Sequence, residues 1–78
     1  MTRKDIDDCV RASVEQYLKD LRGEAPSDLH AMFLGAAERP LLEVVLQHVK
    51  GNQSLAAQCL GINRNTLRRK LQGHKLIK

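Results

Sequence analysis

The chain has 78 residues, a formal net charge of +4 and two cysteines. A single domain of this length removes only about 60–65% of its unfolded surface from water, so a solitary monomer would be marginally stable. Two cysteines are too few for a disulfide scaffold, no apolar run approaches the ~20 residues of a membrane span, and the N-terminus lacks the apolar core of a secretory signal. We therefore expect a reduced, cytoplasmic protein without membrane contact that is stabilised by association.

Charge is divided unevenly along the chain. Residues 1–49 contain six Lys or Arg and nine Asp or Glu, a balance of −3, whereas residues 50–78 contain seven Lys or Arg and no carboxylate, a balance of +7. Such asymmetry is typical of an assembly region joined to a nucleic-acid-binding region. Apolar residues recur within the basic stretch, which favours a folded module over a solvated tail.

The first predicted helix covers Ile6–Leu21, where apolar residues recur at steps of three and four. Gly23 suits the position just after a helix, and Pro26 cannot continue one. Ser27 or Asp28 is expected to cap the next helix. Both cysteines lie among apolar residues at helical spacing, which predicts small buried side chains.

The second predicted helix covers Leu29–Val49 and is apolar most of the way round. A helix of this kind is buried from several sides, which a second subunit can provide, and we expect Val45 at the seam between subunits. Pro40 lies inside the segment. Because the apolar pattern stays in phase across Pro40, we favour a continuous helix with a kink over a break near Arg39.

Two short helices are predicted in the basic stretch, at Gln53–Leu60 and Arg64–Leu71, with Asn52 and Asn63 as their N-caps and Gly61 in the turn between them. A short helix, a glycine turn and a second helix rich in arginine place side chains in a DNA major groove. We therefore predict an all-α, four-helix subunit. It forms one compact domain, with dimerisation helices in residues 1–49 and a helix-turn-helix region in residues 50–78.

The spacing of Ala57, Gly61 and Leu67 is itself typical of a helix-turn-helix, because a small residue four positions before the turn lets the two helices pack steeply. Leu67 and Leu71 lie one turn apart and are predicted to face inward. Asn65, Thr66 and Arg69 then point away from the core, and Arg64 and Arg68 lie along one side at i and i+4. The predicted DNA contacts are Asn52, Ser54, Asn63, Arg64, Thr66, Arg68 and Arg69.

These residues suit different parts of DNA. Arg64 lies in the first turn of the last helix, where an arginine can pair with O6 and N7 of guanine. Asn52 and Ser54 place side chains and free backbone amides where a phosphate can bind. A plain capping role is the alternative for the two asparagines, and solvated charge is the alternative for Arg68, Lys70 and Lys75.

The sequence gives little support for a metal site, a catalytic site or a site for single-stranded nucleic acid. The three histidines, His30, His48 and His74, share no metal-ligand spacing with the cysteines. No catalytic triad, phosphate-binding glycine loop or carboxylate pair can be identified, so we expect no enzyme, no cofactor and no metal. Aromatic residues make up 3% of the chain, which argues against stacking on single-stranded nucleic acid.

The string from Gln47 to Ala57, followed by Leu60–Leu71, resembles the C-terminal signature of the Fis family, bacterial nucleoid-associated proteins first known as factors for inversion stimulation. The segment Glu38–Glu43 resembles the family's second helix with its proline, and the similarity extends over roughly Ile6–Leu71. The resemblance implies an intertwined homodimer. Its recognition helices are closer together than one turn of B-DNA, so the DNA must bend. An A·T-rich centre flanked by guanines is then preferred.

The resemblance also supports the seven predicted contacts, whose positions match those where the family contacts DNA. Ser54 replaces the usual threonine, Arg69 replaces a lysine, and Asn65 stands where the best-known members have glycine. Longer members carry an N-terminal arm that touches a DNA invertase. Only about five residues precede the first predicted helix here, so we do not expect recombinase stimulation. Contact with RNA polymerase stays open, and the alternative function is a helical protein-interaction module without DNA binding.

Overall fold

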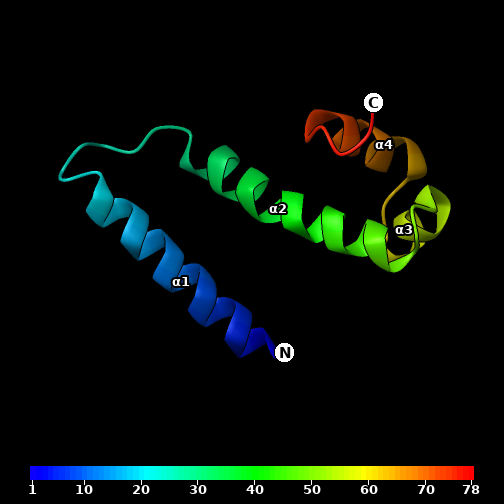
Figure 1. Ribbon diagram of the computed structural model, residues 1–78. Helices are drawn as coiled ribbons and strands as arrows, with labels where there is room; N and C mark the ends of the chain where they lie inside the picture. The colour runs from blue at the N-terminus through cyan, green and yellow to red at the C-terminus, as the bar shows by residue number, and fades with distance from the viewer.

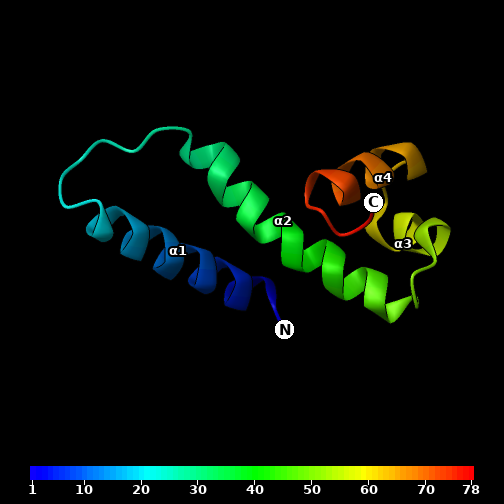
Figure 2. The same ribbon diagram turned by 45° about the horizontal axis from the view of Figure 1, so that its top comes forward.

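The computed structural model describes residues 1–78 as four α-helices, α1 (Arg3–Asp20), α2 (Leu29–His48), α3 (Gln53–Leu60) and α4 (Arg64–Gly73). This confirms the predicted all-α, four-helix class. Helices α1 and α2 form two arms joined by a loop, and α3 and α4 gather at the far end of α2 (Figure 1, Figure 2). None of these helices combines the length and the apolar character that crossing a membrane requires.

Helix α1 begins three residues before the predicted start at Ile6. Thr2 and Asp5 form a capping box, in which the backbone amide of Asp5 donates to the Thr2 hydroxyl at 3.2 Å and that of Thr2 donates to the Asp5 carboxylate at 2.8 Å. The prediction was wrong because apolar periodicity begins only at Ile6, whereas the polar cap lies before it.

Helix α2 continues without interruption through Pro40, so the alternative of a break near Arg39 is wrong and the continuous helix is confirmed. The bend at Pro40 stays a prediction. Asp28 occupies the N-cap position, but its backbone is left-handed, with φ of 52°, and its side chain makes no capping hydrogen bond. A capping side chain folds back onto the first turn from an extended backbone, and the left-handed conformation does not allow this.

The hydrophobic core lies where the C-terminal part of α2 meets α3 and α4. Its buried residues are Leu42, Ala56, Ala57, Leu67 and Leu71, and Val45, Leu46, Val49, Leu60, Ile62, Leu76 and Ile77 pack around them. The exposed fractions of Leu67 and Leu71 are 1% and 0%, which confirms the predicted inward pair. Val45 is half-buried against the chain's own core, and its place at the subunit seam stays a prediction.

The N-terminal arm lacks such a core, since no residue of α1 is buried. Large apolar side chains stay exposed along α1 and α2, namely Ile6, Val10, Leu18, Met32, Leu34, Leu41 and Val44. Both cysteines are also exposed. The prediction of buried cysteines was wrong because Cys9 lies on this open arm and Cys59 points away from the core of the C-terminal half.

The exposed surface and the radius of gyration of the subunit also show that it is open. It exposes 6484 Å² to solvent, whereas a compact monomer of 8.8 kDa exposes about 4,800 Å². Its radius of gyration is 14.9 Å, against about 11.5 Å for a compact domain of this length. A single chain therefore leaves a large apolar area without a partner.

Candidate nucleic-acid interface

The two predicted asparagine caps hold the ends of the helix-turn-helix. The Oδ1 atom of Asn52 accepts from the backbone amide of Leu55 at 3.1 Å, and Oδ1 of Asn63 accepts from that of Asn65 at 2.7 Å. These bonds fix where α3 and α4 begin. The capping role is thereby confirmed for both asparagines, and each keeps a side-chain NH₂ group that can still donate to a ligand.

The turn between α3 and α4 depends on Gly61. Its φ of 70° is left-handed, a conformation that costs a residue with a side chain about 1 kcal/mol. The amides of Gly61 and Ile62 donate to the carbonyls of Gln58 and Ala57 at 3.2 and 3.1 Å, which closes the end of α3. Ala57, with an exposed fraction of 5%, lies under this turn as predicted, where its small side chain allows close packing of α4.

A polar depression of about 430 Å³ lies between the start of α3 and one side of α4. Its lining is Gly51, Asn52, Gln53, Ser54, Arg64, Arg68, Ile77 and Lys78. Four of the seven predicted contacts thus come together, namely the cap and the second residue of α3 (Asn52 and Ser54) and two residues of α4 (Arg64 and Arg68). The lining contains three cationic side chains and no Asp or Glu side chain. This arrangement suits an anion such as a backbone phosphate.

The other three predicted contacts lie outside the depression. Arg69 and Asn65 are exposed, in agreement with their expected outward positions on α4, and the N-cap Asn63 is exposed as well. Thr66 is half-buried rather than fully outward. The candidate interface therefore has two parts, the depression and the outer face of α4.

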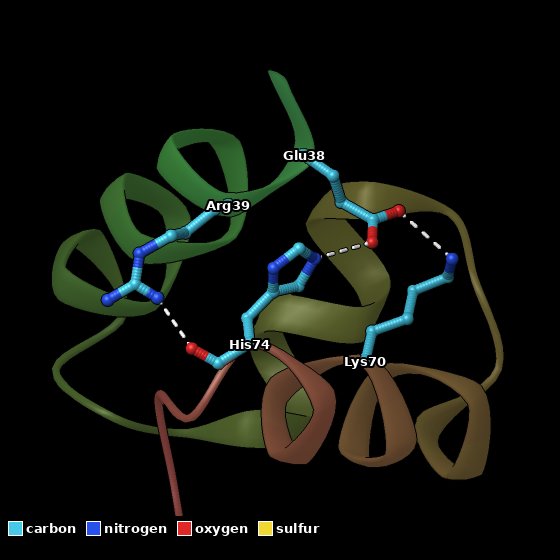
Figure 3. A network of polar contacts seen from close by, with 4 residues as sticks. All are labelled: Glu38, Arg39, Lys70 and His74. Atoms are coloured by element: carbon cyan, nitrogen blue, oxygen red, sulfur yellow. Dashed lines mark hydrogen bonds and ion pairs between the residues drawn. The ribbon is translucent and has the colours of Figure 1, made fainter. Parts of the chain in front are cut away.

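The opposite side of α4 is tied to α2 by a polar network (Figure 3). The Lys70 ammonium donates to Oε2 of Glu38 at 2.9 Å, and Nε2 of His74 lies 2.9 Å from Oε1 of the same carboxylate. Because a carboxylate only accepts, Nε2 of His74 carries the proton. The hydrogen bond from His74, followed by that from Lys70, lowers the pKa of Glu38 below its ordinary value.

A second link joins the same two helices. The guanidinium of Arg39 donates to the backbone carbonyl of His74, just beyond the end of α4. Figure 3 shows Glu38 between Lys70 and His74, with Arg39 reaching the carbonyl from the other side. Since α4 carries the predicted base-reading arginine, these contacts set the orientation of that helix relative to α2.

Sequence reasoning missed this network. Lys70 and His74 lie at i and i+4 on α4, which is a local signal for a shared partner. The partner, however, is 32 and 36 residues away in sequence, and no local pattern identifies it. Lys70 therefore belongs to the links between helices, and the alternative of a purely solvated charge is wrong for this residue.

Residues 33–74 match the family described as "Bacterial regulatory protein, Fis family". The chain belongs to the Fis family. It is 56% identical over 77 residues to a Fis-like DNA-binding protein of Ralstonia nicotianae, covering 99% of this chain and 100% of the relative. A Fis-like DNA-binding protein of Neisseria meningitidis serogroup A is 49% identical over 76 residues, with 97% and 96% covered. DNA-binding protein Fis of Aliivibrio fischeri is 46% identical over 72 residues, with 92% and 74% covered.

Proposed function

We propose that this Fis-family chain is a homodimeric DNA-binding and DNA-bending protein that regulates transcription from within the bacterial nucleoid. The observation that carries the proposal is the depression on the helix-turn-helix. Asn52, Ser54, Arg64 and Arg68 converge there in a lining without an Asp or Glu side chain. The names of the relatives, which describe DNA-binding proteins, support the same ligand.

The two parts of the interface take different roles in this proposal. Asn52 and Ser54 bind a backbone phosphate at the start of α3, which fixes the position of the motif on the duplex. Arg64 pairs with a guanine in the major groove, with Arg68 one turn behind it. Asn63, Thr66 and Arg69 contact phosphates or base edges from the turn and the outer face of α4.

In the proposed dimer, the open arms of the subunit form the interface. The chain exposes about 1,700 Å² more than a compact monomer of its mass. Two subunits that bury these areas reach the range of about 2,000–5,000 Å² typical of obligate interfaces. In this proposal, residues 1–49 form the intertwined dimerisation region and residues 50–78 the DNA-binding region, with the end of α2 packed against the helix-turn-helix core.

Bending follows from the dimer that the family resemblance implies. Two recognition helices closer together than the ~34 Å of one B-DNA turn reach successive major grooves only on curved DNA. The cost of curvature depends on sequence, so an A·T-rich centre is favoured between the guanines that the arginines contact. A bent site could also bring the dimer against RNA polymerase, which would be the route to activation.

The proposal is tested by titrating a duplex with an A·T-rich centre and flanking guanines against the protein at several salt concentrations, with the mass measured by sedimentation. We expect a dimer whose log affinity falls with log salt with a slope of about −5 or steeper, because six or more phosphates lose counterions. End-to-end energy transfer across the labelled duplex should rise on binding. A dimer that does not bind the duplex at low salt would support the alternative function, a protein-interaction module.

A further inference from the structure

The chain reverses direction after α4. Lys75 is left-handed, with φ of 59°. Its amide donates to the Gln72 carbonyl at 3.0 Å, and the amide of Leu76 donates to the Leu71 carbonyl at 2.9 Å. This pair of bonds is a Schellman motif, in which the residue after the turn makes an apolar contact with the last turn of the helix. The reversal sends residues 76–78 back along the helix-turn-helix.

Packing holds this returning segment, residues 76–78, in place. Leu76 and Ile77 are half-buried and pack against the hydrophobic core. The side-chain amide of Gln72 donates to the Lys78 carbonyl at 3.5 Å. The segment is thus anchored on both sides of Ile77, which places Lys78 at a defined point on the surface.

That point lies on the rim of the depression. Ile77 and Lys78 line the depression together with the start of α3, and Lys78 adds a third cation to Arg64 and Arg68. The backbone amides of Gln53 and Ser54, at the start of α3, donate no hydrogen bond within the chain. Three segments distant in sequence therefore offer cationic side chains or free donors to one space, and none offers an Asp or Glu side chain.

We propose that residues 76–78 are part of the DNA-binding site and that Lys78 contacts the backbone phosphate bound at the start of α3. This inference rests on the proposed function and extends it to a segment outside the two helices of the motif. A phosphate is the fitting ligand, since lysine is a compact, strongly hydrated charge without the planar fork that reads guanine. Ile77 acts as a positioning residue, because its packing against the core places Lys78 on the rim.

The test uses Lys78→Gln in the full chain, with Lys78→Arg as the conservative variant and Lys75→Gln as the matched control. Lys75 carries the same charge three residues away, but it does not line the depression. For a dimer that loses two phosphate contacts, Lys78→Gln should make the slope of log affinity against log salt shallower by about 1.8. Lys78→Arg should retain the wild-type slope. Lys75→Gln should leave the slope unchanged.

A change in the salt slope would not result from unfolding of the variant. The Lys78 side chain is exposed, so its replacement should leave the melting temperature unchanged. Suppose that wild-type protein binds the duplex steeply and Lys78→Gln has the same slope. The inference about residues 76–78 is then overturned and the proposed function stands. An equal change in Lys75→Gln would also overturn it, since general charge would explain the effect. Wild-type protein that does not bind the duplex would overturn both proposals.

Discussion

Arg64 and Arg68 differ in role although both line the depression. Arg64 is the first residue of α4, and this end of a recognition helix reaches deepest into the major groove. Arg68 lies one turn further back along α4. We therefore expect base recognition to depend most on Arg64, and general affinity to depend on the whole set of cations around the depression.

Replacing Arg64 by alanine tests this division. The variant should lose about 1–3 kcal/mol of discrimination between a duplex with flanking guanines and one in which they are replaced, because one bidentate pair is lost. The fold should persist, since Arg64 is exposed and takes no part in the core. Competition binding with the two duplexes measures the effect, and Lys75→Gln, outside the depression and outside the predicted contacts, is the matched control. Equal weakening on both duplexes would remove Arg64 from base recognition.

At the scale of elements, local signals located α3 and α4 almost to the residue, because caps and turn residues act on their immediate neighbours. Asn52, Gly61 and Asn63 each form the bond or dihedral angle that their position predicts. The depression was only half predictable. Its two helices follow from the motif, but the wall formed by Ile77 and Lys78 depends on a chain reversal at Lys75, where no glycine or asparagine marks the left-handed residue.

The sequence did not predict which residues of different helices contact one another. Val45 and Val44 are neighbours in one apolar run, and periodicity alone did not show which of them faces the chain's own core. In the structure Val45 packs against that core, and Val44 has an exposed fraction of 63%. Likewise, Glu38 offered no sign that it binds Lys70 and His74, because such a contact requires the relative placement of α2 and α4.

The network at Glu38 makes the attachment of α4 to α2 sensitive to acid. The pKa of this carboxyl is lower in the folded chain than in the unfolded one. Its ionised form therefore stabilises the fold above about pH 4.3, and the contribution disappears as the pH falls through the lower, folded-state pKa. Glu38→Gln should reduce the free energy of unfolding at pH 7 by up to about 1 kcal/mol, the scale of partly exposed ion pairs.

Urea unfolding of wild type and Glu38→Gln at pH 7 and pH 3, at one protein concentration, measures this contribution. The difference between the two proteins should shrink at the lower pH, where wild-type Glu38 is increasingly protonated. Glu43→Gln is the matched control on α2, since the nearest cation of Glu43 is Arg39 at 4.0 Å and both side chains are about half exposed. A difference between wild type and Glu38→Gln that is the same at both pH values would exclude the linkage.

The molecule as a whole combines a packed C-terminal half with two open arms, α1 and the N-terminal part of α2. All five buried residues lie at Leu42 or beyond it. The groove between the arms, lined by Cys9, Val10, Ser13, Phe33, Ala36 and Ala37, is mostly apolar and encloses about 350 Å³. Such a surface is expected to be covered in solution, and the proposed dimer covers it with a second copy of the same arms.

Val44→Asp tests the proposed seam. A carboxylate on this exposed apolar face leaves the helix-turn-helix core intact but costs several kcal/mol when it is buried between subunits. We expect a monomer by sedimentation, with reduced helix content because α1 loses its partner. Val45→Asp would damage the core itself and is less informative. Leu55→Asp, on α3 with an exposed fraction of 46%, is the control and should stay dimeric. A dimeric Val44→Asp protein would place the seam elsewhere.

The absence of any buried residue in α1 has a consequence for gene dosage. If the arms fold only on pairing, subunit concentration enters the folding equilibrium, and thermal stability rises with the amount of protein. Below the dissociation constant of the pair, occupancy of a chromosomal locus then grows with the square of abundance. A twofold change in synthesis would alter occupancy about fourfold, so that occupancy responds steeply to protein abundance without a ligand.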